Sequence, residues 1–217
     1  MMPRSPSSSL GLKRRWRRSG SRFRMSNKGL IFVISSPSGG GKTSIVRRIT
    51  ERDGTLNYIV SATTRPRRSG EREGIDYIFL TEEEFSRWEE EGRFIETTHY
   101  HNHHYGTPKE PLLTKIDRGE DVILDIDVNG GKQVKDLFPE AVLIFLLPPS
   151  KEELRRRLLE RGRESEEEIE ARLRKAEQEI RSANDYDYLV INRDLDQATG
   201  EIISIIAAER SKRKKGG

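Results

Sequence analysis

A glycine-rich stretch near the start of the chain constrains the fold more than any other part of the sequence. Residues 36–43 are Ser-Pro-Ser-Gly-Gly-Gly-Lys-Thr; they follow a short apolar, β-branched run at residues 30–35 and lead into a helical pattern at residues 42–52. The stretch matches the phosphate-loop pattern G-x-x-x-x-G-K-[ST] except at its first position, where Ser36 replaces glycine. A buried strand, this loop and a helix in succession predict the first unit of a nucleotide-binding α/β core.

The residue types of this loop suit a nucleoside triphosphate with its magnesium ion. Three consecutive glycines let several backbone N–H groups converge on phosphate oxygens, and the start of the helix adds its dipole. Lys42 is expected to place its charge on the β- and γ-phosphates, and Thr43 to offer its hydroxyl to Mg²⁺. The whole loop is therefore predicted to bind the nucleotide: Ser36, Pro37, Ser38, Gly39, Gly40, Gly41, Lys42 and Thr43. The alternative is a flexible glycine-rich turn with an incidental lysine.

Three further apolar runs predict the other strands of the same sheet, at residues 122–126, 142–147 and 188–191. Helical patterns separate them, which favours βαβ units, a parallel sheet and an α/β fold. A chain of 217 residues has room for one domain with an inserted subdomain. It contains no cysteine, which excludes disulfides, a thiolate nucleophile and a cysteine zinc site. Its longest apolar run, residues 141–147, is too short to cross a membrane as a helix.

Between about residues 60 and 102 the pattern changes. Short strand candidates at residues 58–62, 77–80 and 94–97 lie close together, with one helical pattern among them. This spacing predicts a small mixed or antiparallel insertion rather than another βαβ unit.

Several helix starts are marked by local motifs. Thr81, Ser150 and Ser165 are each followed three residues later by glutamate, as in a capping box, and Thr107-Pro108 predicts a helix with proline at its first position. The helix that begins near residue 166 carries one apolar stripe: Ile169, Leu173, Ala176, Ile180 and Ala183. Residues 212–217 are expected to form a frayed basic tail.

A second group of residues resembles the acceptor site of guanylate kinases. It comprises Ser61-Ala-Thr-Thr-Arg65-Pro-Arg-Arg68-Ser-Gly-Glu71, then Asp76-Tyr77, Phe94-Ile-Glu96 and Tyr105-Gly-Thr107. With the phosphate loop and Asp125-Ile-Asp127, the resemblance covers residues 29–209, and the chain is similar to a bacterial-type guanylate kinase, a P-loop nucleoside monophosphate kinase. The resemblance implies transfer of the γ-phosphate of ATP to GMP, with ATP as co-substrate and Mg²⁺ as cofactor.

Within this resemblance, four residues are expected to hold the GMP phosphate: Arg65, Arg68, Tyr77 and Tyr105. Two guanidinium groups three residues apart in a non-helical segment can converge on one phosphate. Glu96 is expected to select the base, because a carboxylate accepts both the N1–H and the N2 amino protons of guanine, whereas adenine has an acceptor at N1. The resemblance adds Ser61, Thr107 and Asp127 to the base pocket. A solvated basic loop and an ordinary edge carboxylate are the alternatives.

Two aspartates close the run at residues 122–126, at the carboxyl end of a strand, where open α/β sheets bind ligands. Strand alternation predicts that Asp125 and Asp127 point to the same face. Asp125 is expected to orient Mg²⁺-bound water opposite Thr43. The resemblance implies that Asn192 lies beside the adenine of ATP.

Arginines in the predicted helical segment at residues 150–175 form a possible lid. Arg157 and Arg161 stand four apart, hence on one helical face, and Arg172 follows after a break. The resemblance implies that they close on the donor phosphates, where cations stabilise the charge of the transferring phosphoryl group. With Lys42 and Arg65, they are the predicted catalytic residues. The alternative is a helix with scattered solubilising arginines.

The resemblance also divides the chain. Residues 25–217 are predicted to form the guanylate kinase-like domain, with a core at 29–60, 111–150 and 176–210, a GMP-binding insertion at 61–110 and a lid at 150–175. Residues 1–24 hold eight Lys and Arg and no acidic residue, so they account for the net charge of +4 and should be disordered. They could be a transit peptide, a nucleic-acid-binding arm or, most simply, an over-extended reading frame that should begin at Met25.

All four histidines lie together, as His99, His101, His103 and His104. Such a cluster could bind zinc or nickel, but a metal there would interfere with the expected Tyr105 and Thr107 contacts, so no native metal role is expected. Two other functions stay open: a non-catalytic module that binds phosphopeptides, and an NTPase or kinase for another monophosphate. We expect a cytoplasmic protein with GMP and ATP as its partners, and neither nucleic acid nor membrane; the oligomeric state stays open.

Overall fold

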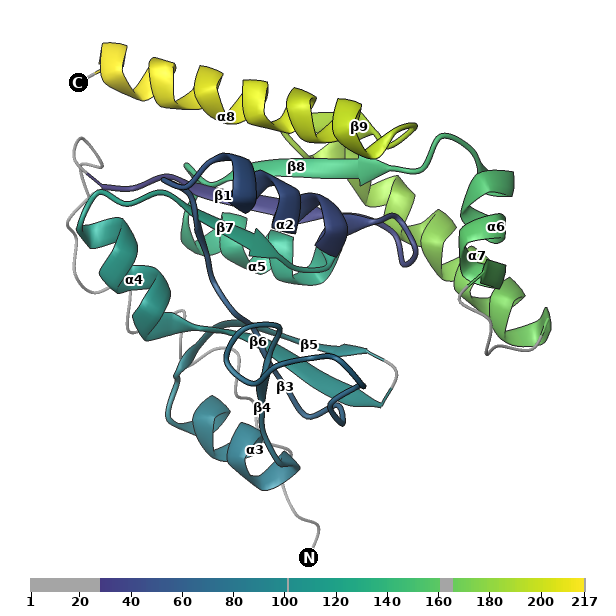
Figure 1. The fold of residues 1–217 in the computed structure, drawn as a ribbon. Helices are drawn as coiled ribbons and strands as arrows, with labels where there is room; N and C mark the ends of the chain where they lie inside the picture. The colour runs from purple at the N-terminus through teal and green to yellow at the C-terminus, as the bar shows by residue number, and fades with distance from the viewer. Residues whose placement is uncertain (1–27, 101, 161–165, 217) are drawn as a thin grey trace, which may run out of the picture.

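Five parallel strands form the central sheet of the molecule, in the order β2-β7-β1-β8-β9 (Figure 1). The computed structural model describes residues 28–100, 102–160 and 166–216. Every residue of the central strand β1 is buried. The strands are β1 (Ile31–Ser35), β2 (Asn57–Tyr58), β7 (Val122–Asp125), β8 (Val142–Leu147) and β9 (Tyr188–Ile191). This arrangement confirms the predicted α/β fold with a parallel sheet.

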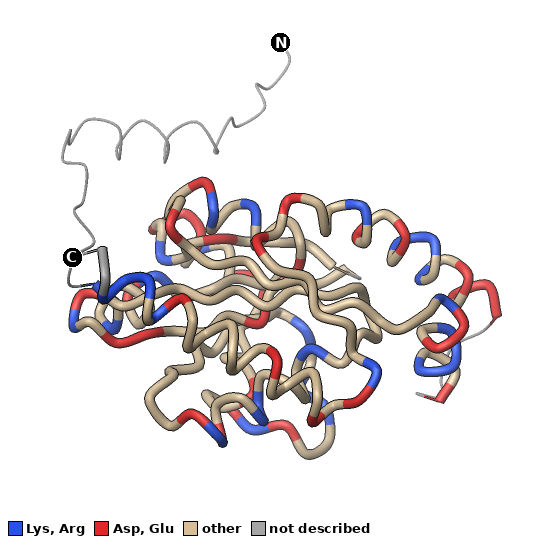
Figure 2. Tube along the Cα trace, turned by 90° about the horizontal axis from the view of Figure 1, so that it is seen from above, with Lys and Arg blue, Asp and Glu red and all other residues tan. Residues whose placement is uncertain are grey.

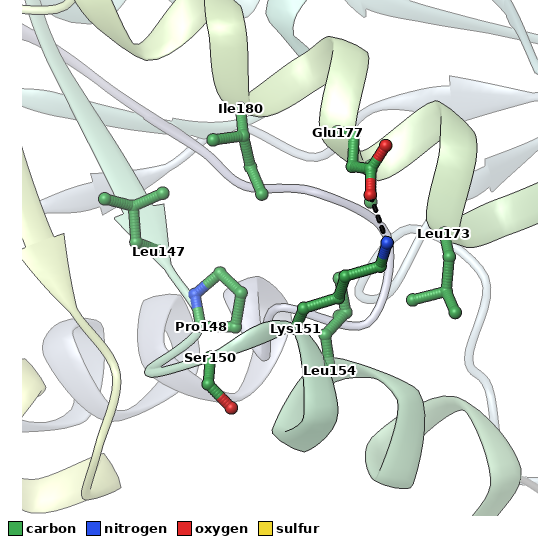
Figure 3. A pocket seen from close by; sticks show the side chains of 9 residues that line it. Leu147, Pro148, Ser150, Lys151, Leu154, Leu173, Glu177 and Ile180 are labelled. Atoms are coloured by element: carbon green, nitrogen blue, oxygen red, sulfur yellow. Dashed lines mark ion pairs between the residues drawn. The ribbon is translucent and has the colours of Figure 1, made fainter.

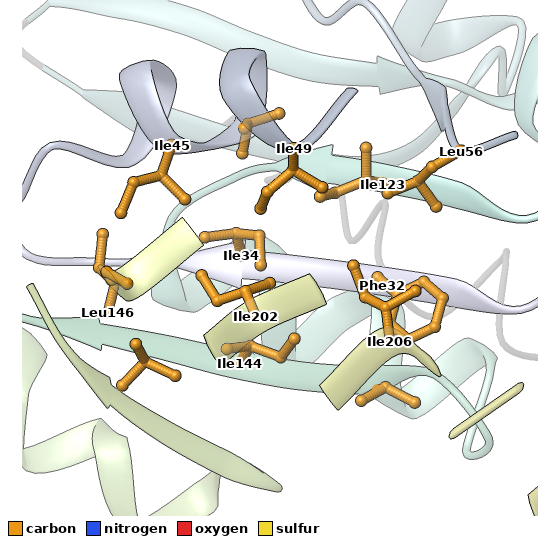
Figure 4. Close-up of a cluster of buried hydrophobic side chains, with 14 residues drawn as sticks. Phe32, Ile34, Ile45, Ile49, Leu56, Ile123, Ile144, Leu146, Ile202 and Ile206 are labelled. Atoms are coloured by element: carbon orange, nitrogen blue, oxygen red, sulfur yellow. The ribbon is translucent and has the colours of Figure 1, made fainter. Parts of the chain in front are cut away.

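Helices cover both faces of this sheet. On one face lie α2 (Lys42–Arg52) and α8 (Leu195–Gly216), and on the other lie α4 (Lys109–Asp117) and α5 (Val128–Leu137) (Figure 1). Figure 4 shows the core under α2 and α8, where Ile49, Ile202 and Ile206 surround the strand side chains. Each fully buried isoleucine contributes about 1.5–3 kcal/mol, so this layer fixes the strand from which the phosphate loop leaves.

A second, mixed sheet of four strands lies beside the first, in the order β4-β3-β6-β5. Its elements are β3 (Ala62–Thr63), β4 (Ile78–Phe79), α3 (Glu82–Glu90), β5 (Phe94–Tyr100) and β6 (His103–Pro108). One strand had been predicted at residues 58–62, and this prediction was wrong. Ile59 is buried against the first sheet, whereas Ala62 is buried against Phe85 of α3 and Phe94 of β5, so the chain crosses between the sheets there.

Two helices stand at one end of the central sheet: α6 (Lys151–Glu160) and α7 (Glu166–Arg181), which continues into the 3-10 turn η1 (Ser182–Asp185) (Figure 1). Three residues of the predicted apolar stripe, Ile169, Leu173 and Ala176, pack against Leu154 and Leu158 of α6. Ile180 is only partly buried, and Ala183 lies past the end of α7, in η1. Acidic and basic residues are interspersed along both helices (Figure 2). Within the described residues, no helix is long and apolar enough to span a membrane.

The helix-end motifs were predicted with mixed success. The capping box of Thr81 and Glu84 is complete. At Ser150 only half of the capping box forms, since the Ser150 hydroxyl accepts the N–H of Glu153. The Glu153 carboxylate does not return to the backbone of Ser150 but pairs with Arg156 and Arg157. Ser165 lies outside the described residues. The helix predicted from Thr107-Pro108 begins one residue later, because Thr107 belongs to β6 and Pro108 is the N-cap of α4.

The C-terminal segment was also predicted incorrectly. Residues 212–216 continue α8 instead of fraying. The guanidinium of Arg213 donates to the carbonyl of Lys28 at 2.8 Å and to Asp121 at 3.0 Å. Asp121 is buried and also pairs with Arg210 of the same helix, so the two arginines hold the end of α8 against the core.

Candidate functional site

The phosphate loop connects β1 to α2 with two glycines in the left-handed region, Gly39 at φ 89° and Gly41 at φ 88°. Gly40 packs against the side chain of Ser36 and leaves no room for a side chain of its own, because a Cβ at this position would lie 2.8 Å from the Ser36 hydroxyl oxygen. Among the described residues other than glycine, positive φ occurs only at Asn102, so Ser36 needs no glycine-like backbone at the first motif position. The Ser36 hydroxyl donates to the carbonyl of Pro37 at 3.1 Å.

Three predicted site residues meet at the base of this loop. Lys42 Nζ lies 3.0 Å from Asp125 Oδ1 and donates to the carbonyl of Ile126 at 2.9 Å. The hydroxyl of Thr43 donates to Asp125 Oδ2 at 2.9 Å. Burial by itself would lower the pKa of Lys42, but the neighbouring carboxylate of Asp125 outweighs it and leaves this pKa raised. Lys42 is therefore a protonated, partly buried cation at the loop.

The expected strand alternation fails at Asp127. Strand β7 ends at Asp125, and Asp127 is the N-cap of α5, where its Oδ1 accepts the N–H of Gly130 at 2.8 Å. Its Oδ2 accepts the hydroxyl of Thr98, which belongs to β5 of the second sheet, at 2.9 Å. Asp127 thus caps a helix of the core and also links that helix to the second sheet.

Glu96 lies in the interior between β5 and α5, and only 3% of it is exposed. Its Oε1 accepts the hydroxyl of Thr107 at 2.6 Å, whereas its Oε2 accepts no hydrogen bond from any residue that the structure describes. Burial raises the pKa of this carboxyl to about 7, since the Thr107 hydrogen bond offsets only part of the effect. A buried carboxylate with one unsatisfied oxygen costs free energy unless a ligand supplies donors.

The predicted basic pair divides between interior and surface. Arg65 is buried, donates to Glu71 Oε1 at 2.8 Å, and lies 5.3 Å from the ring centre of Tyr77. The ring of Tyr105 lies edge-on at 6.1 Å from that of Tyr77. Arg68 is exposed, and its backbone N–H donates to Glu71 Oε2 at 2.7 Å. Glu71 therefore holds the side chain of Arg65 with one oxygen and the backbone of Arg68 with the other.

The arginines of α6 and α7 approach the phosphate loop. Arg157 donates to Glu153 at 2.8 Å and to the carbonyl of Asn192 at 3.0 Å, and Arg172 donates to the Ser38 hydroxyl at 2.6 Å. The amide of Asn192 is buried and donates to the carbonyl of Gly40 at 2.9 Å, so it supports the loop from behind. Arg161 lies outside the described residues.

Two further predictions concern polar groups near the second sheet. Ser61 is buried just before β3, and its carbonyl accepts the N–H of Ile78 at 2.9 Å. The rings of His99 and His104 lie 4.8 Å apart, but the described residues hold no group of three or more side chains that could bind a metal ion. His101 lies outside them.

Sequence reasoning missed several residues that shape the site. Gly130 is one: a Cβ there would lie 2.6 Å from Glu96 Oε2, so the glycine makes room for the carboxylate. Gln133 is another, because its amide donates to the carbonyl of Thr97 at 2.9 Å and ties β5 to α5. Glu71 shares a segment with Arg65 and could have been considered for its charge, whereas Glu179 contacts Ser38 across 141 residues and left no local signal.

Comparison with known proteins gives consistent matches. A family model described as guanylate kinase matches residues 28–209. A curated guanylate kinase from Caldanaerobacter subterraneus subsp. tengcongensis is 49% identical over 183 residues, which are 84% of this chain and 89% of that protein. One from Thermus thermophilus is 46% identical, over 88% of this chain and 86% of the relative. The crystal structure of guanylate kinase from Anaplasma phagocytophilum aligns with a TM-score of 0.72 at 35% identity, covering 84% of this chain and 87% of that one.

Proposed function

Because the chain belongs to the guanylate kinase family, we propose that it transfers the γ-phosphate of ATP to GMP, giving ADP and GDP. The observation that carries this proposal is the buried Glu96, whose Oε2 has no partner among the described residues. A neighbouring phosphate loop with a protonated Lys42 supports the same reaction, since it suits a triphosphate donor. The reaction belongs to purine nucleotide metabolism, and we place it in the cytoplasm.

The guanine base is proposed to bind edge-on to Glu96. Its N1–H and N2 amino group would supply the donors that the carboxylate lacks, while the Thr107 hydroxyl fixes the other oxygen. Ser61 and Asp127 complete the proposed pocket. Adenine has a lone pair at N1, which would face the carboxylate, so AMP is disfavoured.

The GMP phosphate is proposed to bind Arg65 and Arg68, with hydroxyls from Tyr77 and Tyr105. The Arg65 guanidinium is already held in place by Glu71 and by the ring of Tyr77. A phosphate dianion can share or take over this cation, because it offers the same bidentate acceptor geometry with more charge. The exposed Arg68 side chain can then fold onto the phosphate from the surface.

The donor ATP is proposed to lie on residues 36–43, with Lys42 turning from Asp125 to the β- and γ-phosphates. The Thr43 hydroxyl and the Asp125 carboxylate meet at 2.9 Å, and both are oxygen ligands of the kind Mg²⁺ prefers, so the residues present fit this ion. When bound, Mg²⁺ would neutralise part of the phosphate charge. Asn192, which holds Gly40, is proposed to lie beside the adenine.

No protein nucleophile is needed, because a phosphate oxygen of GMP itself attacks the γ-phosphorus. The chain positions both nucleotides and supplies cations, namely Lys42, Arg65, Arg157, Arg161 and Arg172. We propose that residues 61–110 act as the GMP-binding insertion and 150–175 as a lid on a core of 29–60, 111–150 and 176–210. Closure of both parts would exclude water and limit ATP hydrolysis.

A screen of monophosphate acceptors at fixed ATP and Mg²⁺ tests the proposed function. ADP formation should be fast with GMP and at least about 100-fold slower with AMP or dTMP. ADP that appears without any stimulation by GMP would indicate an NTPase and overturn the proposal. No ADP at all, with a phosphopeptide bound instead, would favour the non-catalytic module.

Gly130→Ala should raise the KM for GMP about tenfold or more and leave the KM for ATP near its original value. The added Cβ would meet Glu96 Oε2 at 2.6 Å and force the carboxylate out of line with the base. Steady-state kinetics with each nucleotide varied in turn measures this. Gly200→Ala in α8 is the control, because a Cβ there would meet no atom within 4 Å beyond its chain neighbours and the adjacent backbone of its own helix. Equal effects on both KM values would refute the steric explanation.

The pH profile should carry the titration of Glu96. With its pKa near 7, the carboxyl is protonated in acid and cannot accept both guanine protons, so kcat/KM for GMP should fall about tenfold per pH unit below pH 7. The folded protein holds this proton more tightly than the unfolded chain, so the free protein should also lose stability as pH rises from 4.5 to 7. Both effects should vanish in Glu96→Gln; an unchanged acid limb in that variant would assign the titration elsewhere.

A further inference from the structure

Helix α7 presents a charged face next to its apolar stripe. Arg172, Lys175 and Glu179 are spaced three and four residues apart, so they lie on one side of the helix. Glu177 lies on the other side of the stripe, where it pairs with Lys151 across an apolar pocket of about 240 Å³ (Figure 3). The charged face and the pocket are therefore separate parts of the same helix.

The charged face contacts both nucleotide regions. At the phosphate loop, the Ser38 hydroxyl accepts from Arg172 at 2.6 Å, and the Ser38 N–H donates to Glu179 Oε2 at 3.3 Å. Toward the second sheet, Lys175 Nζ lies 3.7 Å from the ring centre of Tyr100, at the end of β5. One helix thus holds the hydroxyl and the N–H of a loop residue and also contacts the end of β5 in the second sheet.

Glu179 is an unexpected residue at this place, since a buried carboxylate beside a phosphate site repels the ligand. It is only 8% exposed, and burial raises its pKa although Lys175 and the Ser38 N–H act in the opposite direction. The proposed transfer gives it no chemical step, because the nucleophile is a phosphate oxygen. Its visible action is on the loop: it accepts the N–H of Ser38, and Pro37 accepts that of Gly40, so both groups point to protein acceptors.

We propose that Glu179 is a positioning residue for the donor, which fixes the first half of the phosphate loop by accepting the Ser38 N–H. The proposal rests on the proposed function, in which residues 36–43 bind ATP. By holding Ser38 from the same helix that carries Arg172, Glu179 also links the loop to the lid. In this proposal, ATP binding depends on an acceptor oxygen of residue 179 lying within hydrogen-bond distance of the Ser38 N–H. It does not depend on the negative charge of that residue.

Two substitutions separate reach from charge. Glu179→Gln keeps an acceptor oxygen at the same distance and removes the charge, whereas Glu179→Asp keeps the charge and withdraws the oxygen by one methylene. ATP affinity is measured directly by calorimetry, and the KM values for ATP and GMP by coupled assay. We expect Glu179→Asp to weaken ATP binding and raise its KM about tenfold, the size expected for the loss of one ordinary hydrogen bond. Glu179→Gln should stay within about threefold of the unaltered protein, and the KM for GMP should change little in either.

Glu177→Gln is the matched control, because it removes the charge of a glutamate on the exposed side of the same helix. It should change neither the affinity for ATP nor the KM for ATP or GMP. The reverse order, with Glu179→Gln impaired and Glu179→Asp normal, would overturn the proposal in favour of a role for the charge. Equal losses in both variants, or none in either, would also overturn it. If the unaltered protein binds ATP without any reaction with GMP, the proposed function fails, while the affinity ratio still tests Glu179.

Discussion

Glu96→Gln is expected to remove most of the preference for GMP. The amide turns an N–H₂ group toward guanine, so at least one acceptor is replaced by a donor that faces another donor. Losing one charged hydrogen bond and creating this mismatch should cost about 3–4 kcal/mol, or roughly 10²–10³ in kcat/KM for GMP. AMP should be affected far less, because it does not benefit from the carboxylate. Kinetics with both acceptors at saturating ATP measures the change.

Glu110→Gln is the matched control, since Glu110 is an exposed glutamate of α4 and its loss should leave both acceptors unaffected. Folding is not a concern for Glu96→Gln. It removes a carboxyl whose pKa burial raises to about 7, so above that pH the variant should be at least as stable as the unaltered protein. Retained GMP selectivity in a stable Glu96→Gln protein would show that another group recognises the base.

Lys42→Met should reduce kcat about 10³-fold or more. The lysine is the partly buried cation of the phosphate loop, and a preorganised charge aimed at the transferring phosphoryl group stabilises that group by several kcal/mol. Methionine fills a similar volume but leaves Asp125 without its cationic partner. Single-turnover transfer from ATP to GMP measures the chemical step directly.

The double variant Lys42→Met with Asp125→Asn separates catalysis from folding. A loss of stability in Lys42→Met would come from the uncompensated carboxylate of Asp125, whose side chain is only 7% exposed, so neutralising Asp125 should restore the melting temperature. Activity should not return in the double variant, because it still lacks a cation for the phosphates. Lys42→Met with more than a tenth of the original kcat would contradict the assigned role of the loop.

Much of the fold could be predicted because its signals are local. The phosphate-loop motif predicts the strand before it and the helix after it. The capping box of Thr81 and Glu84, which spans only four residues, predicts the start of α3. The predictions were wrong where contacts between distant segments determine the local structure. Residues 58–62 look like one strand but are shared between two sheets, and residues 212–216 look like a basic tail but are held by the buried Asp121.

The candidate site shows the same division. Thr43 and Asp125 could be paired from the sequence, because a phosphate loop and the end of a neighbouring parallel strand must meet; the contact of Lys42 with Asp125 was not predicted. Asp127 could not be placed, since its helix-capping role depends on where β7 ends. Gly130 and Glu179 act only through contacts with Glu96 and Ser38, far along the chain, and nothing in their local sequence indicates those partners.

The central claim is that a buried carboxylate accepts two protons from the edge of guanine. Inosine monophosphate tests it most directly, because hypoxanthine keeps the N1–H and lacks the N2 amino group. Calorimetry of both nucleotides with the unaltered protein and with Glu96→Gln should give about tenfold or greater preference for GMP in the first and almost none in the second. The same preference in both proteins would contradict the account, since the amino group would then be recognised without Glu96.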